Sequence, residues 1–145
     1  MKKRTFIIPH IGELDKPVLK VLKEHPEWWG GVDLEDLLHT DFYDVISDTG
    51  DLVGFFGNAH WLNTDGTSEC VLCCVYVYEE YRKQGIFKKM VKYTIDHNTT
   101  VNLITIGAMD GNDLAHTIYN KMFRYSHHDD EAEGDFYIIR DRRPL

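Results

Sequence analysis

The stretch "ECVLCCVYVYEEYRKQGIFKKMVKYTIDHNTTVNLITIGA", residues 69–108, decides the fold of this chain. Residues 69–77 are almost all apolar, which predicts a central strand covered on both faces. From Gly85 the apolar residues recur with helical spacing, and residues 101–108 return to a strand pattern. Strand, helix and strand in this order predict a βαβ unit whose two strands are parallel and joined by a right-handed crossover.

The segments on either side of this stretch predict further strands and helices. Upstream, hydrophobic patterns and turn residues predict a strand at 4–9, helices at 15–26 and 33–39, and a hairpin of strands at 42–47 and 52–61. Downstream, they predict a helix at 114–122, a polar loop at 127–135 and a last strand at 136–140. No repeat or linker interrupts the chain. We therefore expect residues 1–145 to form a single domain of the α/β class, with a mixed, mostly antiparallel sheet flanked by helices.

The two helices predicted in the second half of the chain each carry an apolar row that should pack on the sheet. In the first helix the row consists of Ile86, Phe87, Met90, Val91 and Thr94. In the second helix it consists of Leu114, Ala115, Ile118, Tyr119 and Met122.

Composition and charge limit the classes of partner. Hydrophobic residues make up 43% of the 145 residues, which is typical of a folded globular domain. The net charge of −8 makes nucleic acid a poor partner. No run of about 18 apolar residues is present that could cross a membrane. Polar residues interrupt the apolar start of the chain, so we also expect no signal peptide.

Three cysteines, Cys70, Cys73 and Cys74, lie in one short run, which argues against a disulfide framework and favours a reducing, cytoplasmic location. In a regular strand Cys70 and Cys74 point to one face and Cys73 to the other. Thiolates placed in this way would not converge on a metal ion. We therefore interpret the three residues as buried structural cysteines and expect no metal.

The junction before the first of these helices has the features of an anion site. Residues 82–92 contain five basic residues and no acidic one. A strand that turns sharply into a helix presents free backbone N–H groups and the positive end of the helix dipole, and diphosphate is the usual occupant. Gly85 would let the backbone approach such a ligand closely. The pattern is neither a Walker loop nor a dinucleotide fingerprint, and a single glycine is also compatible with an ordinary loop.

Two stretches resemble a known family. "CVYVYEEYRKQGIFKKMVKYTI", residues 74–95, resembles the cofactor-binding motif of the GNAT superfamily of acyl-CoA-dependent N-acyltransferases. In that motif a strand leads into Arg/Gln-x-x-Gly-x-Gly/Ala at a helix start, and Arg82, Gly85 and Phe87 occupy the three places here. "NDLAHTIYNKM" looks like the second signature of the family, which is matched by Asn112, Ala115, Ile118 and Tyr119. The resemblance covers residues 42–125 best and the N-terminal third loosely.

The resemblance implies the GNAT fold and an acetyl-CoA-dependent N-acetyltransferase. The residues that it places around the pyrophosphate of coenzyme A are Arg82, Lys83, Gln84, Gly85, Ile86, Phe87 and Lys88. The backbone of Val75, Tyr76 and Val77 would bind the pantetheine arm like an added strand. Asn112 would support the reactive end of the cofactor, and Tyr119 would be the general acid that protonates the departing thiolate.

The acceptor side is less defined by the sequence. The acceptor implied is a primary amine, either a small cationic amine or the lysine or N-terminus of a peptide, acetylated by direct transfer in a ternary complex. Glu69 is the first candidate for the base, with Glu79 and Asp110 as alternatives. Trp28 and Trp29 could line the acceptor cleft or cover the core. A monomer and a homodimer are both compatible with the sequence.

Two positions depart from the family pattern. Phe87 stands where the family has a small residue, so its ring must turn into the core or it would crowd the phosphates. Phe123 and Arg124 stand where the family has Gly-Phe. The second departure bears only on where the helix ends. Phe87 leaves an alternative function open, namely an inactive GNAT-fold module that binds acyl-CoA or another protein without turnover.

Overall fold

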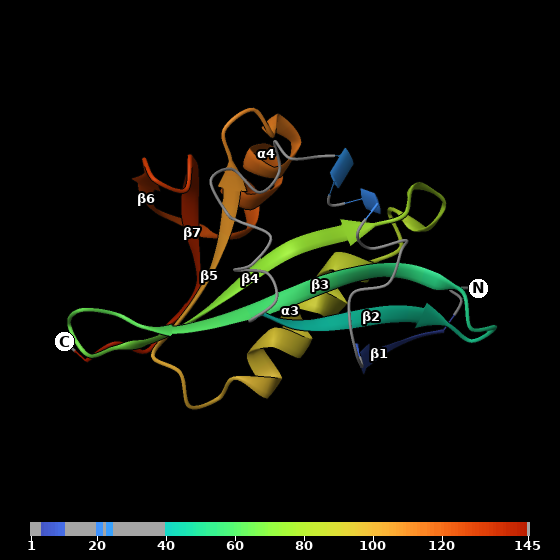
Figure 1. The fold of residues 1–145 in the computed structure, drawn as a ribbon, viewed down its shortest axis with the longest axis horizontal. Helices are drawn as coiled ribbons and strands as arrows, with labels where there is room; N and C mark the ends of the chain where they lie inside the picture. Colours follow the sequence, from blue (N-terminus) through green and yellow to red (C-terminus); the bar gives the residue numbers. More distant parts are fainter. Residues whose placement is uncertain (1–3, 11–19, 22, 25–39, 145) are drawn as a thin grey trace.

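The computed structural model describes residues 4–10, 20–21, 23–24 and 40–144. Within these residues seven strands form one sheet in the order β1-β2-β3-β4-β5-β7-β6 (Figure 1). The strands are β1 Thr5–Pro9, β2 Asp41–Ser47, β3 Leu52–Leu62, β4 Ser68–Val77, β5 Leu103–Met109, β6 Arg124–Asp129 and β7 Gly134–Asp141. The helices are the short 3-10 helix η2 Glu79–Tyr81, α3 Ile86–His97 and α4 Asp113–Met122. In the described part of the chain, no helix is long and apolar enough to cross a membrane.

The predicted βαβ unit is confirmed, because β4 and β5 are parallel and α3 connects them. All other neighbouring strands in the sheet are antiparallel, as predicted for a mixed sheet. The predicted helix at 15–26 is described at residues 20–21 and 23–24, which are helical, and the helix predicted at 33–39 lies outside the described residues.

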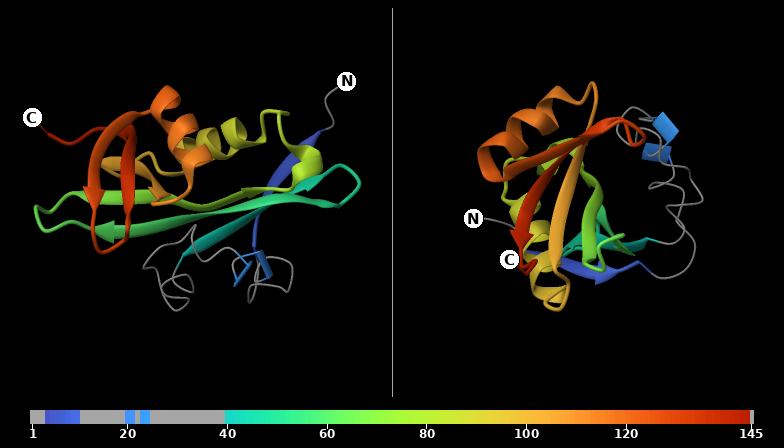
Figure 2. Two further views of the ribbon diagram at one scale, coloured as in Figure 1. Left: turned by 90° about the horizontal axis from the view of Figure 1, so that it is seen from above. Right: turned by 90° about the vertical axis from the view of Figure 1, so that its left-hand side faces the viewer.

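Helices α3 and α4 both lie on one side of the sheet (Figure 2). The larger core cluster fills the space between them and the strands. Its buried members are Val45, Val53, Phe56, Leu72, Ile86, Met90, Val91, Ile106, Ala108, Tyr119 and Tyr137. A smaller cluster lies on the opposite face of the sheet and consists of Val21, Phe42, Phe55 and Cys74.

Polar groups between β3 and α3 hold the helix in one position on the sheet. Asn58 donates from Nδ2 to the hydroxyl of Thr94 at 3.1 Å, and Asn98 donates from Nδ2 to Oδ1 of Asn58 at 3.1 Å. All three side chains are buried. Because buried polar groups are costly unless they are hydrogen-bonded, this network favours one position of α3 along the sheet.

A β-bulge at Cys74 corrects the predicted directions of the cysteine side chains. Cys74 has a φ of +52°, and the pairing of β3 with β4 shifts between Phe55 and Gly57. The extra residue inverts the alternation, so Cys73 and Cys74 both lie on the face of the smaller cluster. Cys70 shares the other face with Leu72. The prediction that Cys70 and Cys74 share a face is therefore wrong.

The surroundings of Cys70 and Cys74 favour protonated thiols. Burial raises the pKa of Cys70 to about 12. A hydrogen bond with the Cys73 thiol, together with burial, raises the pKa of Cys74. Protonated thiols are poor nucleophiles and poor metal ligands. Among the residues that the structure describes, no three histidine, cysteine or acidic side chains converge on a metal-binding geometry.

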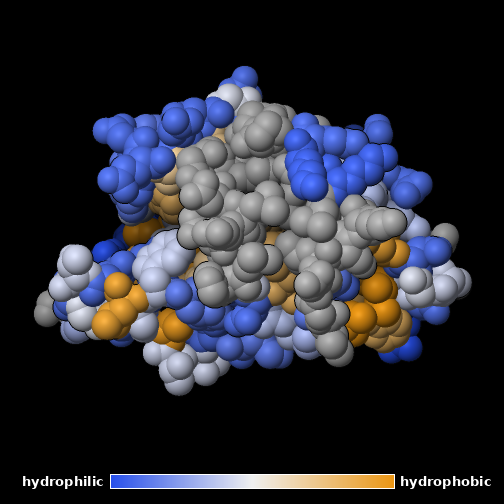
Figure 3. Space-filling view, viewed as in Figure 1, coloured by the Kyte–Doolittle hydropathy of each residue, from blue (hydrophilic) through white to orange (hydrophobic). Residues whose placement is uncertain are grey.

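Strand β6 was not predicted, because its sequence was interpreted as the start of a polar loop. It pairs antiparallel with β7, and five of its six residues are exposed. Figure 3 shows a strongly hydrophilic surface in the region of β6 and β7. An edge strand with both faces polar lacks the alternation on which a sequence-based prediction depends.

The apolar row predicted for α4 is only partly buried. Ala115 packs against the larger cluster and Tyr119 belongs to it, as expected. Leu114, Ile118 and Met122 remain 68%, 37% and 40% exposed, respectively. The row is wider than the strip of helix surface that contacts the sheet, because α4 rests on the sheet along the line through Ala115 and Tyr119.

Candidate functional site

The end of β4 leads into α3 through η2 and a short connection that contains Arg82 and Lys83. After η2, Lys83 and Gly85 both have positive φ values, +63° and +78°. Gly85 is the N-cap of α3 and has no side chain with which to cap the helix, and no acidic residue lies in the first turn. The first-turn N–H groups of a helix have no intrahelical acceptor, and the helix dipole makes this end positive. This junction is therefore suited to bind an anion through backbone groups.

Glycine is required at position 85 by backbone conformation. With a φ of +78° the residue lies in the left-handed region, where a side chain is strained. Among the described residues, a Cβ built there would meet nothing within 4 Å, so this part of the structure leaves the space above the helix start open. A ligand could approach the backbone from this side.

The basic side chains predicted for this junction gather there. Arg82 donates from Nε to the carbonyl oxygen of Val77 at 2.9 Å, and its guanidinium lies 5.7 Å from the centre of the Tyr76 ring. Arg82 thereby ties the connection to the last residue of β4. Lys83 and Lys88 are exposed and add positive charge. Gln84 also faces the connection, donating to the Glu80 carbonyl at 3.4 Å.

The ring of Phe87 turns towards the core. Phe87 is half-buried and packs against the larger cluster. Its ring stacks on Tyr119 at a centroid distance of 5.7 Å and lies edge-on to Phe123 at 6.4 Å. The Phe87 ring therefore turns inwards, as the sequence requires if it is not to crowd the phosphates. The first turn of α3 thus directly contacts the helix that carries the candidate acid.

The second junction, between β5 and α4, positions Asn112 and Tyr119. Asn112 caps α4, and its side-chain oxygen accepts a hydrogen bond from the Ala115 N–H at 3.3 Å. Tyr119 is the buried residue of this helix and packs against Phe87, Phe123 and Tyr137. Burial raises the pKa of the Tyr119 phenol, so its hydroxyl keeps its hydrogen at neutral pH.

The two parallel strands of the unit separate towards these junctions. The pairing of β4 with β5 runs from Glu69 and Leu103 to Leu72 and Ile106. Beyond this point β4 continues to Val77, and the two strands diverge (Figure 1). The bulge at Cys74 lies where the separation begins. The backbone from Val75 to Val77 therefore has β3 as its strand neighbour, and among the described residues no strand pairs with its other edge.

Of the candidate bases, Glu69 lies at the paired end of β4. Its two carboxylate oxygens accept hydrogen bonds from the Asn63 side chain at 3.2 Å and the Thr105 hydroxyl at 2.8 Å. Glu79 is exposed in η2, and Asp110 is exposed directly after β5. The structure thus does not bring the three together. Trp28 and Trp29 lie outside the described residues.

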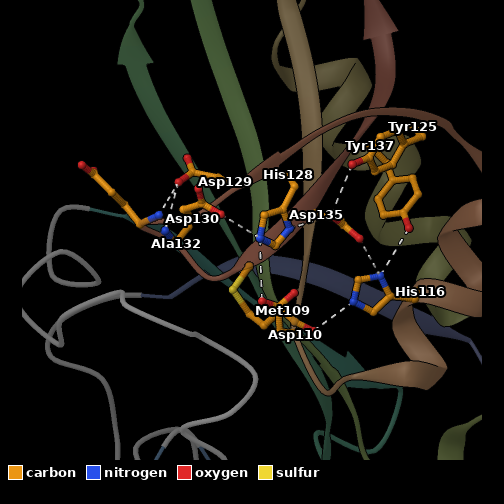
Figure 4. Close-up of polar contacts among 11 residues, drawn as sticks. Met109, Asp110, His116, Tyr125, His128, Asp129, Asp130, Ala132, Asp135 and Tyr137 are labelled. Atoms are coloured by element: carbon orange, nitrogen blue, oxygen red, sulfur yellow. Dashed lines mark hydrogen bonds and ion pairs between the residues drawn. The ribbon is translucent and has the colours of Figure 1, made fainter.

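A polar cluster next to α4 was not predicted from the sequence (Figure 4). Asp135 of β7 lies between two histidines: its Oδ1 is 2.9 Å from Nδ1 of His128, and its Oδ2 is 3.4 Å from Nδ1 of His116. Nε2 of His128 is 3.3 Å from Asp130 and 3.9 Å from Asp110. The sequence signal was the pair His127-His128 among acidic residues. This pair lies in the stretch predicted to be a polar loop, and the contact with Asp135 forms because part of that stretch belongs to β6.

The acetyltransferase (GNAT) family model matches residues 12–124 of the chain. No curated protein matches the sequence significantly. Among solved structures, a GNAT-family acetyltransferase from Staphylococcus aureus has a TM-score of 0.64 at 18% identity, covering 97% of this chain and 100% of the other. Arabidopsis thaliana NAA60 in complex with acetyl-CoA has a TM-score of 0.61 at 13% identity, with 93% and 96% coverage.

A third similar structure is spermidine N-acetyltransferase from Vibrio cholerae in complex with CoA and spermine. Its TM-score is 0.58 at 12% identity, and the alignment covers 92% of each chain. At these identities the structural similarity establishes a common fold, whereas activity and substrate depend on the residues of each site.

Proposed function

The chain belongs to the GNAT acetyltransferase family, and from this membership we propose that it transfers an acetyl group from acetyl-CoA to a primary amine. The observation that carries the proposal is the uncapped start of α3 at Gly85, directly beyond the strand that separates from β5. A bare helix start with open space above it is suited to a diphosphate, and the separated strand edge is suited to an extended amide chain. Coenzyme A contains both groups.

In this proposal the donor is held mostly by backbone. The amides of Gln84, Gly85, Ile86 and Phe87 bind the diphosphate, with the charges of Arg82, Lys83 and Lys88 around them. The backbone of Val75, Tyr76 and Val77 pairs with the pantetheine arm as an added strand would. Asn112, which already caps α4, supports the reactive end of the donor.

The proposed reaction is a direct transfer. The neutral amine attacks the thioester carbonyl, the new N–C bond forms, and the C–S bond breaks. Tyr119 gives its phenolic proton to the departing thiolate and is reprotonated from solvent. A thiolate is a good leaving group that needs little help, so a phenol held nearby is a sufficient acid. Burial raises the pKa of Tyr119 and thereby keeps its proton in place at neutral pH. Backbone N–H groups near the bulge would polarise the carbonyl.

Glu69 stays the proposed base that takes the proton of the attacking amine. The hydrogen bonds from Asn63 and Thr105 hold its carboxylate in one orientation. Replacing Glu69 by Gln should remove the lower-pH limb of the pH–rate profile if it is the base. An unchanged profile would eliminate it and direct attention to Glu79 or Asp110.

The acceptor proposed is a cationic amine, because the chain carries a net charge of −8. The similarity to a spermidine acetyltransferase supports polyamines as the first group to test. Peptides with a free N-terminus or lysine form the second group. Trp28 and Trp29 stay predictions for the wall of the acceptor site.

Two measurements test the proposal. Calorimetry with acetyl-CoA should give binding, and release of free thiol should then depend on an added amine. Binding without thiol release across the amine panel would favour the inactive module. Absence of binding would contradict both the acetyltransferase and a module that binds acyl-CoA. The inward orientation of the Phe87 ring, which stacks on Tyr119, supports the active enzyme over the inactive module.

A further inference from the structure

The start of α4 is fastened to the end of β5 at a single carbonyl oxygen. The carbonyl of Met109 accepts a hydrogen bond from the backbone N–H of Asn112 at 3.0 Å. The same oxygen lies 3.1 Å from Nε2 of His116 (Figure 4). Because a carbonyl oxygen only accepts, Nε2 of His116 must carry a hydrogen. The imidazole is therefore a second link between α4 and β5.

The other ring nitrogen of His116 faces β7. Nδ1 lies 3.4 Å from the Tyr137 hydroxyl and 3.4 Å from Oδ2 of Asp135. A neutral His116 with its hydrogen on Nε2 has an acceptor at Nδ1, which can take the hydroxyl hydrogen of Tyr137.

This imidazole lies between the two residues of α4 that the proposed function places at the donor. His116 is one turn after Asn112, whose carbonyl accepts its backbone N–H at 3.2 Å, and three residues before Tyr119. Tyr137, which His116 contacts, is 1% exposed and lies edge-on to the Tyr119 ring at 5.9 Å. A displacement of His116 would therefore also move Tyr119, because the two residues share a helix and both contact Tyr137.

The turn before α4 explains why a contact between His116 and the sheet would be useful. Gly111 has a φ of +88°, and a Cβ there would meet nothing within 4 Å. A turn with this freedom does not by itself determine the direction in which the helix leaves the strand. The cap at Asn112 satisfies a helix N–H group, whereas the His116 side chain connects the helix to β5 and β7.

We propose that His116 is a positioning residue. Its Nε2–H bond to Met109 and its Nδ1 contact with Tyr137 fix the position of α4 relative to the end of β5. They thereby fix the positions of Asn112 and Tyr119. The role in catalysis rests on the proposed function, whereas the hydrogen-bonding pattern can be tested without it.

A pair of variants tests the proposal, because the amide nitrogen of glutamine reaches the place of Nε2 and that of asparagine reaches only the place of Nδ1. His116→Gln keeps a donor for the Met109 carbonyl and should stay within about twofold of the wild-type kcat. His116→Asn removes it and should lower kcat about tenfold while changing KM for acetyl-CoA less than about twofold. Equal kcat values for both variants and the wild type would overturn the proposal.

A matched control separates positioning from general stability. His97 of α3 also bonds a backbone carbonyl, that of Tyr93 at 2.9 Å, but lies at the far end of its helix. His97→Gln should leave kcat unchanged. If His97→Gln lowers kcat as much as His116→Asn does, the effect is a general consequence of losing an imidazole–carbonyl bond, and the proposal fails.

Ring nitrogen resonances of His116 report the hydrogen-bonding pattern directly. We expect the neutral ring to carry its hydrogen on Nε2, and a neutral Nδ1–H form would overturn the proposal. If the wild type released no thiol, the proposed function would fail separately. Hydrogen exchange of the backbone amides at residues 112–116 would then test the His116–Met109 hydrogen bond. We expect faster exchange in His116→Asn than in His116→Gln, and equal exchange rates would overturn the proposal.

Discussion

The two strand-to-helix junctions of the βαβ region differ in how their helices begin. Helix α3 starts at Gly85, which has no capping side chain, and no acidic residue lies in its first turn. Helix α4 starts at Asn112, whose side chain accepts from the Ala115 N–H, and Asp113 lies in its first turn. The two strands are parallel, so both helices start beyond the same end of their strands. The start of α3 is nevertheless suited to bind an external anion, whereas the start of α4 is capped by the chain itself.

The proposed function assigns donor binding to the α3 junction and chemistry to the α4 junction. The first-turn N–H groups of α3 are left for an external acceptor, and basic residues surround them. In α4 the cap occupies one such group, and a carboxylate cancels part of the positive field. We therefore expect changes at the α3 junction to alter donor binding and changes at the α4 junction to alter kcat.

The largest expected effect is at Tyr119. Tyr119→Phe should lower kcat about a hundredfold, because a positioned general acid contributes about this factor or more. The affinity for acetyl-CoA should change little, as the ring packing is kept. Steady-state thiol release and calorimetry measure the two quantities.

Tyr125→Phe is the matched control for this variant. Tyr125 is half exposed on β6, and its hydroxyl donates to Asp135 at 3.4 Å. We expect wild-type kcat in this variant. A Tyr119→Phe protein with wild-type kcat would show that Tyr119 is not the acid. It would also weaken the assignment of donor binding to the α3 junction and of kcat to the α4 junction.

The next effect is at the α3 junction, where Gly85→Ala should weaken acetyl-CoA binding by about tenfold, or about 1.4 kcal/mol. A side chain strains the left-handed backbone and stands in the open space above the helix start. Gly66→Ala is the control, since Gly66 has a φ of +87° and is equally open but lies in the turn between β3 and β4.

Both glycine variants should lose about 1 kcal/mol of unfolding free energy from backbone strain, measured by urea denaturation. Only Gly85→Ala should change the dissociation constant for acetyl-CoA. If the two variants bound acetyl-CoA equally well, the α3 junction would not be the diphosphate site.

A smaller effect is expected at the cap of α4. Asn112→Ala should reduce the unfolding free energy by about 1 kcal/mol, because the Ala115 N–H loses its acceptor. Asn112→Asp keeps an acceptor and should retain most of the stability. Equal loss in both variants, measured by urea denaturation, would show that the cap contributes little.

The smallest effect is the pH dependence of the polar cluster. A hydrogen bond to the Asp135 carboxylate raises the pKa of His128, with Asp110 and Asp130 adding to the shift and partial desolvation opposing it. A raised folded-state pKa means that this stabilisation is fully present below the unfolded value of about 6.5. It is lost as the pH rises through the folded value.

The difference in melting temperature between wild type and His128→Asn should therefore be larger at low pH than at high pH. The neutral Asn side chain can accept or donate but cannot carry the charge that the carboxylates favour. A difference that grows with rising pH would contradict the assigned direction of the His128 shift.

The sequence predicted more of the α3 junction than of the α4 junction. Gly85 and the basic residues around it are neighbours in the chain, so their local pattern was sufficient. The cluster of His116, His128 and Asp135 joins α4, β6 and β7, which pairing alone brings together. Because β6 carries no apolar alternation, the contact could not be predicted.

The sequence by itself determined the βαβ unit, the antiparallel hairpin, the start of α3 and the residues of the two junctions, because helical and strand periods and turn residues act over short distances. Tertiary structure alone decided which way Cys73 and Cys74 point, since a bulge depends on the partner strand. It also decided the exposure of Leu114, Ile118 and Met122 and the inward turn of Phe87. These features depend on how each element packs on the others, which no local pattern specifies.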